Sequence, residues 1–321
     1  MELTCKLNSP EDLVTTLSQT RAGFIEAALE KNRKAQPYIE DARTLKNLAS
    51  AAKNPYELLN ISSIQKGLLT ASGLSDKSLN YFTEADKQEA IKKLIEEFLA
   101  PAGDDFIDEL VYRYLLIRGD SLGGSMRNLI GAIAKTKLVR KLLSVLSMER
   151  IEFFIQKKDD RSTNKWQLLD YETAYSVADE IYAVFWRYDG DDKVICFDTT
   201  IAVVKKNVDI CLYKVSKTRF NGGSIAKEIF PAIMYGELKG GIDPAGADEH
   251  WKTGNTALTR IRTAFSERGY SVKTSFVGAA IEKEMAKEIF YQINSGILSY
   301  AANLTFDHQL TNYCEWLVKL K

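Results

Sequence analysis

The chain has 321 residues, of which 45% are apolar and 27% charged, a composition typical of a globular protein with one large or two ordinary domains. Basic and acidic residues number 43 each, so the net charge is zero and gives no support to attraction of nucleic acid by bulk positive charge. No apolar run is long enough for a membrane span or a signal core, and the four cysteines lack paired metal-ligand spacing, so we expect a cytoplasmic protein that contacts no membrane.

Helical patterns fill the first part of the chain. Ser9, Pro10 and the two acids that follow predict the start of a helix that extends to about residue 34. Pro37 is expected to interrupt this helix. Together these patterns predict a mainly helical domain over residues 1–145. Further helices are expected at 44–48, from Thr83 onward, and over 105–117.

Residues 118–128 are rich in glycine and are expected to form a loop. A serine-hydrolase site at its Gly-Asp-Ser-Leu sequence is rejected, because a serine nucleophile needs a histidine base and the chain has only two histidines. Two alternatives remain. The segment is an ordinary loop, or it is a phosphate cradle in which Arg118, Arg127 and free amides lead into a helix over 126–143. The basic residues of that helix form either a DNA-backbone contact face or a solvated face: Lys135, Lys137, Arg140 and Lys141.

Strand and helix patterns alternate after residue 150, which predicts a mixed α/β domain over residues 146–321. Residues 246–266 are expected to form a helix or a loop that leads into one. Strands are expected at 151–155, 181–186, 194–197, 201–204, 208–213, 229–234, 270–277 and 298–304, and further helices at 171–179, 280–293 and 306–320.

Two neighbouring strands of this domain carry the residues that suggest chemistry. Glu237 and Lys239 are two residues apart after an apolar run, so they point to the same face of a strand end. Asp209 lies in the preceding strand, where a lone acid is costly unless its charge is compensated. A divalent metal shared by the two acids would compensate it, and the lysine could orient or deprotonate an attacking water. The pattern is that of the PD-(D/E)xK nucleases, and its alternative is a surface ion pair.

The segment from Gly236 to Trp251 resembles the AvaI/BsoBI group of type II restriction endonucleases. The resemblance implies an α/β PD-(D/E)xK nuclease core, with a mixed central sheet flanked by helices, after a mainly helical domain that embraces DNA. It also implies a Mg²⁺-dependent homodimer on double-stranded DNA. The implied target has the form C-Y-C-G-R-G, cut on both strands to leave 5′ overhangs.

The same resemblance implies roles for the residues around the acid and lysine pattern. Asp209 and Glu237 become metal ligands together with the main-chain carbonyl of Leu238, and Lys239 becomes the catalytic lysine. His250 matches a histidine proposed to assist the attacking water, and its alternative is a residue that orients DNA or packs beside a tryptophan.

Base recognition is expected from Asp243 and Lys77. An aspartate can accept a hydrogen bond from cytosine N4, and a lysine can donate to guanine O6 and N7. The alternative is that both are ordinary loop charges. Two other functions remain open for the chain as a whole, namely a structure-specific or repair nuclease with the same core and a DNA-binding protein without activity.

Overall fold

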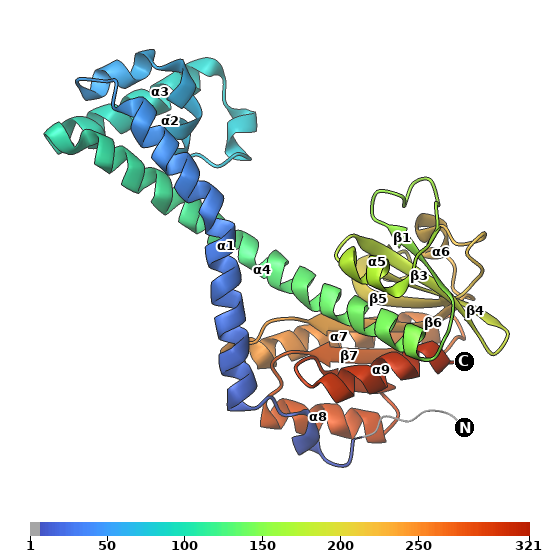
Figure 1. The fold of residues 1–321 in the computed structure, drawn as a ribbon. Coiled ribbons are helices and arrows are strands. Elements are labelled where there is room, and N and C mark those ends of the chain that lie inside the picture. The colour runs from blue at the N-terminus through green and yellow to red at the C-terminus, as the bar shows by residue number, and fades with distance from the viewer. Residues whose placement is uncertain (1–6) are drawn as a thin grey trace. The chain divides into compact units, whose positions relative to one another are not determined.

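The computed structural model describes residues 7–321, which pack into two units (Figure 1). One unit contains residues 7–24 and 129–321, and the other contains residues 25–128. The long helices α1 (Leu17–Ala49) and α4 (Phe106–Met148) contribute to both units. This division differs from the expected boundary at residue 145, because the end of α4 buries its apolar side chains against the sheet.

The helical unit, residues 25–128, has its own apolar core. Leu45 of α1 and Leu110 of α4 are buried in it together with side chains of the short helices between them. The helix predicted from Thr83 onward is α3 (Glu84–Leu94), and Thr83 caps it through a capping box with Asp86. The short helices of this unit are η2 (Pro55–Asn60), η3 (Ser62–Ile64), α2 (Gln65–Ala71), η4 (Ser78–Tyr81), α3 (Glu84–Leu94), η5 (Ile95–Leu99) and η6 (Ala100–Asp105).

The expected course of the first helix is wrong at both ends. A short 3-10 helix, η1 (Pro10–Leu13), comes first, and α1 starts separately at Leu17. α1 then continues through Pro37 to Ala49. Proline removes one helical hydrogen bond, but residues beyond it such as Leu45 are buried in the helical core, and this packing outweighs the local cost.

The glycine-rich segment 118–128 is also helical, contrary to the loop expectation. It lies in the middle of α4, so its backbone amides are used inside the helix and cannot form a phosphate cradle. Leu122 is buried, whereas a Cβ added at any glycine of this segment would meet no atom within 4 Å. Each glycine costs helix stability of about 1 kcal/mol relative to alanine, and the burial of apolar neighbours along α4 offsets that cost.

A mixed sheet forms the centre of the other unit, and the predicted α/β architecture is confirmed. Among the described residues it has eight strands in the order β2-β1-β3-β4-β5-β6-β7-β8. Neighbours are antiparallel from β2 to β6 and parallel from β6 to β8. The strands are β1 (Phe153–Lys157), β2 (Gln167–Leu168), β3 (Ile181–Tyr188), β4 (Asp191–Ile201), β5 (Lys206–Lys214), β6 (Ala232–Lys239), β7 (Lys273–Gly278) and β8 (Tyr300–Asn303).

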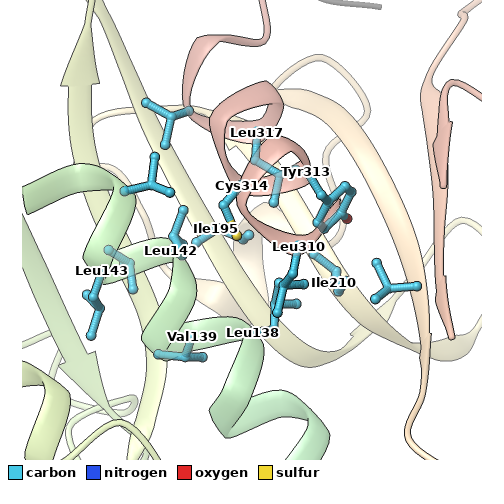
Figure 2. Packing of buried hydrophobic residues seen from close by; sticks show 14 of the residues in the cluster. Leu138, Val139, Leu142, Leu143, Ile195, Ile210, Leu310, Tyr313, Cys314 and Leu317 are labelled. Carbon is cyan, nitrogen blue, oxygen red and sulfur yellow. The ribbon is translucent and has the colours of Figure 1, made fainter. Parts of the chain in front are cut away.

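Helices cover both faces of this sheet (Figure 1). The end of α4 and α9 (Asp307–Lys319) pack on one face, and α7 (Ala247–Ser266) packs on the other. α7 and α8 (Lys283–Asn294) also make the crossovers that parallel strands require. Two shorter helices are α5 (Tyr171–Ser176) and α6 (Gly222–Ile225). Figure 2 shows the packing of α4 and α9 with two strand residues: Leu138, Leu142, Leu310, Cys314, Ile195 and Ile210.

Some details differ from expectation. The strand expected at 201–204 is wrong, because β4 ends at Ile201 and a turn follows in which Lys205 has a left-handed φ of 53°. Three cysteines are buried free thiols, namely Cys196, Cys211 and Cys314, and the fourth lies outside the described residues. Among residues 7–321, no helix combines the length and the apolar character needed to cross a membrane.

Candidate active site

The carboxylates of Asp209 and Glu237 lie close together where the pairing of β5 with β6 ends. Ile210 of β5 pairs with Gly236 of β6, so the next residues along, Asp209 and Glu237, lie opposite each other on the face that α7 covers. The backbone N–H of Leu238 donates a hydrogen bond of 2.8 Å to the Asp209 carboxylate. The carbonyl of a strand residue points to the same edge as its N–H, so the Leu238 carbonyl also points toward β5.

Lys239 places its ammonium between these carboxylates. Its Nζ lies 2.6 Å from Oε2 of Glu237 and 3.5 Å from Oδ2 of Asp209. Glu237 and Lys239 therefore project side by side, as the two-residue period of a strand predicts. The ion pair that was the alternative to a metal site also exists, but it is largely buried and does not lie on the surface.

The cluster carries an excess of negative charge in a buried place. Glu237 is only 5% exposed, and a Cβ added at Gly254 of α7 would lie 3.7 Å from the Cβ of Glu237. Burial and the charge of Asp209 raise the pKa of Glu237 to about 7, although the ammonium of Lys239 opposes this rise. Burial by itself would lower the pKa of Lys239, but the charges of Asp209 and Glu237 raise that pKa above its usual value.

These residues fit a hard divalent cation. Two carboxylates and the Leu238 carbonyl offer oxygen ligands only, and burial together with the charge of Asp209 raises the pKa of Glu237 despite the lysine beside it. Within residues 7–321 no group of three or more His, Cys, Asp or Glu is placed to hold a metal. Few protein ligands together with several waters are typical of Mg²⁺, whereas a structural zinc site needs four protein ligands.

His250 lies in the first turn of α7, so of the two alternatives for residues 246–266 the structure has the helix. The short helix η7 (Pro244–Gly246) precedes α7, and together they turn the chain back toward β6. The His250 ring lies against Gly241, two residues beyond Lys239. Asp243 is exposed at the start of η7, where its carboxylate accepts a hydrogen bond from the N–H of Ala245.

The other candidate DNA contacts lie in the helical unit. Lys77 and Arg127 are exposed. The Arg118 side chain is only 15% exposed, and its guanidinium packs over the rings of Tyr38 and Tyr114. Its Nη1 lies 3.7 Å from Asp76, the neighbour of Lys77. Arg118 therefore anchors the segment that carries Lys77, a role that its position in the sequence did not suggest.

Most basic residues of the following helix are already paired. Lys135 is 9% exposed and its Nζ lies 2.5 Å from Asp198. Arg140 lies over the Tyr175 ring, and the Lys141 ammonium is 2.7 Å from Asp307. Of the two alternatives for these residues, a solvated face is wrong for Lys135, and a DNA-backbone contact face stays a prediction. Asp198 of β4 has a left-handed φ of 49°, and no sequence motif identified it.

Comparisons with known proteins show the family of the chain. A family model described as restriction endonuclease BsobI matches residues 4–320. The type II restriction enzyme BsoBI of Geobacillus stearothermophilus is 49% identical over 315 residues, which cover 98% of this chain and 97% of that protein. Type II restriction enzymes named AvaI, from Nostoc sp. strain PCC 7120 and from Anabaena variabilis, are each 45% identical and cover 98% of both chains.

Proposed function

The chain belongs to the BsobI family of restriction endonucleases and is a type II restriction enzyme, and from this premise we propose how and where it cuts DNA. We infer a Mg²⁺-dependent hydrolysis of phosphodiester bonds in duplex DNA, at a palindrome of the form C-Y-C-G-R-G, that leaves 5′ overhangs. The observation that supports this proposal most is the cluster of Asp209, Glu237 and Lys239 at the ends of β5 and β6.

Each residue of the cluster has a separate task in the proposal. Asp209, Glu237 and the Leu238 carbonyl would hold Mg²⁺, which when bound supplies positive charge for the reacting phosphate and lowers the pKa of a water. The ammonium of Lys239, 2.6 Å from Glu237, orients the attacking water and offsets the negative charge that develops on the phosphate. His250 takes a proton from the attacking water.

Recognition is assigned to residues outside the cluster. Asp243, which directly precedes η7, is proposed to accept a hydrogen bond from a cytosine N4. Lys77 is proposed to donate a hydrogen bond to a guanine. Arg127, which is exposed, is proposed to contact the DNA backbone. A second copy of the chain would cut the second strand of the palindrome, so we propose a homodimer that acts on double-stranded DNA in the cytoplasm.

A plasmid digest in Mg²⁺ tests the proposal. Discrete fragments whose ends read C-Y-C-G-R-G with 5′ overhangs are expected. Ragged degradation would instead indicate a structure-specific or repair nuclease, and intact DNA that is still bound would indicate a binding protein without activity. Discrete fragments with other ends would overturn the target but not the enzyme class. Light scattering of the free protein would check the homodimer.

A further inference from the structure

Two glycines, Gly240 and Gly241, follow Lys239 in the segment between β6 and η7. Glycine is often needed where φ is left-handed, but neither residue has such a φ. Among the described residues, glycines with a positive φ lie elsewhere: Gly73, Gly103, Gly190, Gly269 and Gly296. A residue with a side chain could adopt this backbone conformation. The reason for glycine at these positions is therefore the lack of space for a side chain.

The space beside Gly241 is filled by the imidazole of His250. A Cβ at position 241 would lie 2.7 Å from Cε1 and 3.3 Å from Nδ1 of His250. The first distance is too short for a real contact, so something would have to move. The atom that it meets is the tip of a side chain with two rotatable bonds, so the ring would move and the backbone would not.

Gly246 borders the same ring with more clearance. A Cβ at position 246 would lie 3.7 Å from Cε1 and 3.8 Å from Nε2 of His250, which is ordinary van der Waals contact. No hydrogen bond or ion pair holds the imidazole of His250 within residues 7–321. The two glycines therefore border the ring, and Gly241 is the one that leaves no clearance for a side chain.

Gly241 is itself held in place through Gly240. A Cβ at position 240 would lie 2.6 Å from Cβ of Ala134 and 2.8 Å from the backbone oxygen of Ile130, both on α4. A helix carbonyl cannot move aside as a side chain can, so Gly240 fixes the segment against α4. The segment that borders the imidazole is thus closely packed on α4, and it begins directly after Lys239.

We propose that Gly241 is the positioning residue for His250, because the absence of a side chain at 241 lets the imidazole occupy its place beside the end of β6. The inference rests on the proposed function, in which His250 acts at the reacting phosphate. Gly241 touches neither the DNA nor the metal in this proposal, so its effect on the reaction passes entirely through the ring of His250.

A double-mutant cycle with Gly241→Ala and His250→Ala tests this coupling. We expect each single variant to slow single-turnover cleavage in Mg²⁺ at saturating enzyme by on the order of 10²-fold. The double variant should be no slower than His250→Ala alone, and DNA binding in Ca²⁺ should stay unchanged in all three. Losses that multiply in the double variant would overturn the proposal, and so would a wild-type rate in His250→Ala.

Two matched control variants show whether the loss in Gly241→Ala comes from its contact with His250 or from adding a methyl group anywhere nearby. Gly246→Ala faces the same ring at an ordinary contact distance, and Gly131→Ala on α4 meets open space, so both should keep the wild-type rate within a factor of two or so. A large loss in Gly246→Ala would mean that any change near α7 is harmful. A Gly241→Ala protein that does not fold would also overturn the proposal, because the backbone and not the ring would have yielded.

The ring can be observed directly, because the chain has only two histidines. In protein with labelled histidine, the ¹H–¹³C spectrum should show two Cε1 signals, and Gly241→Ala should shift the one that His250→Ala removes. An unmoved signal would overturn the positioning of the ring. If the wild-type protein did not cleave DNA, the proposed function would fail, whereas this spectrum would still decide whether Gly241 positions His250.

Discussion

The carboxylate of Asp209 accepts a hydrogen bond of 2.8 Å from the backbone N–H of Leu238, the residue between Glu237 and Lys239. This bond fastens the end of β6 to β5 at the point where the ladder between the two strands stops. Asp209, which is proposed to bind the metal, thus also fixes the backbone between Glu237 and Lys239. Substitutions of Asp209 can separate these two roles.

Asp209→Asn and Asp209→Ala are expected to differ in stability but not in activity. Both variants remove a negative charge from the proposed metal site, so neither should cleave DNA. Asparagine retains an oxygen that can accept the Leu238 N–H, whereas alanine leaves that donor without its partner and should lose about 1 kcal/mol of unfolding free energy. Urea denaturation and a plasmid assay check the two parts. Full cleavage by either variant would contradict the metal assignment.

Glu237→Gln should stabilise the metal-free protein above neutral pH. The folded pKa of Glu237 is about 7, above the ordinary glutamate value, so the folded state holds a proton between pH 4.5 and 7 that the unfolded state releases. Wild-type stability therefore falls as pH rises through this window, by roughly 1 to 3 kcal/mol, and the glutamine variant lacks this fall.

Thermal unfolding of both proteins in EDTA at pH 5 and pH 8 measures the difference. We expect nearly equal stability at pH 5 and a more stable variant at pH 8. Saturating Mg²⁺ should cancel the advantage at pH 8, because a bound cation favours the charged carboxylate. Equal stabilities at both pH values would contradict the raised pKa.

Lys239→Ala should slow cleavage by on the order of 10²-fold or more, the usual scale for a positioned acid–base or electrostatic group. It should also destabilise the metal-free protein, because Glu237 and Asp209 would lose the ammonium between them. Lys239→Arg is expected to restore stability but not rate, since a guanidinium keeps its proton and has a different shape. Quench-flow rates at saturating enzyme, with denaturation curves of the same proteins, separate the two effects. A wild-type cleavage rate in the alanine variant would mean that Lys239 has only a structural role.

Asp243→Asn tests base recognition with little disturbance of the turn. The asparagine oxygen can still accept the Ala245 N–H that Asp243 holds at 3.0 Å, but its amide can also donate and so matches cytosine less well. We expect discrimination between the cognate site and single-base variants to fall by about 1 to 3 kcal/mol. Competition binding in Ca²⁺ measures this, with Asp248→Asn as an exposed control on α7. Unchanged discrimination would make Asp243 an ordinary loop charge.

Arg118→Ala should change the stability of the protein, whereas Arg127→Ala should change its binding to DNA. Arg118 is largely buried over two tyrosine rings, so its loss should lower the stability of the protein by roughly 1 to 2 kcal/mol. Arg127 is exposed, so its loss should leave stability unchanged and reduce the salt dependence of DNA binding by about one unit of slope. Binding titrations at several salt concentrations decide the second point, and an unchanged slope would remove Arg127 from the interface.

The placement of Glu237 and Lys239 on β6 could be predicted from the sequence alone. The two-residue period of a strand is a property of the backbone, so Glu237-x-Lys239 had to place both side chains on one face wherever the strand lay. The cost of a lone buried acid likewise pointed to a partner for Asp209. The capping box at Thr83 is equally local, because its hydrogen bonds join residues three apart.

Tertiary packing decided what local signals could not. Glycines at 119, 123 and 124 and the proline at 37 are valid loop signals, but burial of side chains along α4 and α1 outweighs a local cost of about 1 to 3 kcal/mol at each position. The contact between Gly241 and His250 depends on how η7 and α7 return toward β6. No periodicity encodes that contact, because it joins two elements whose separation is set by the packing of α7 on the sheet.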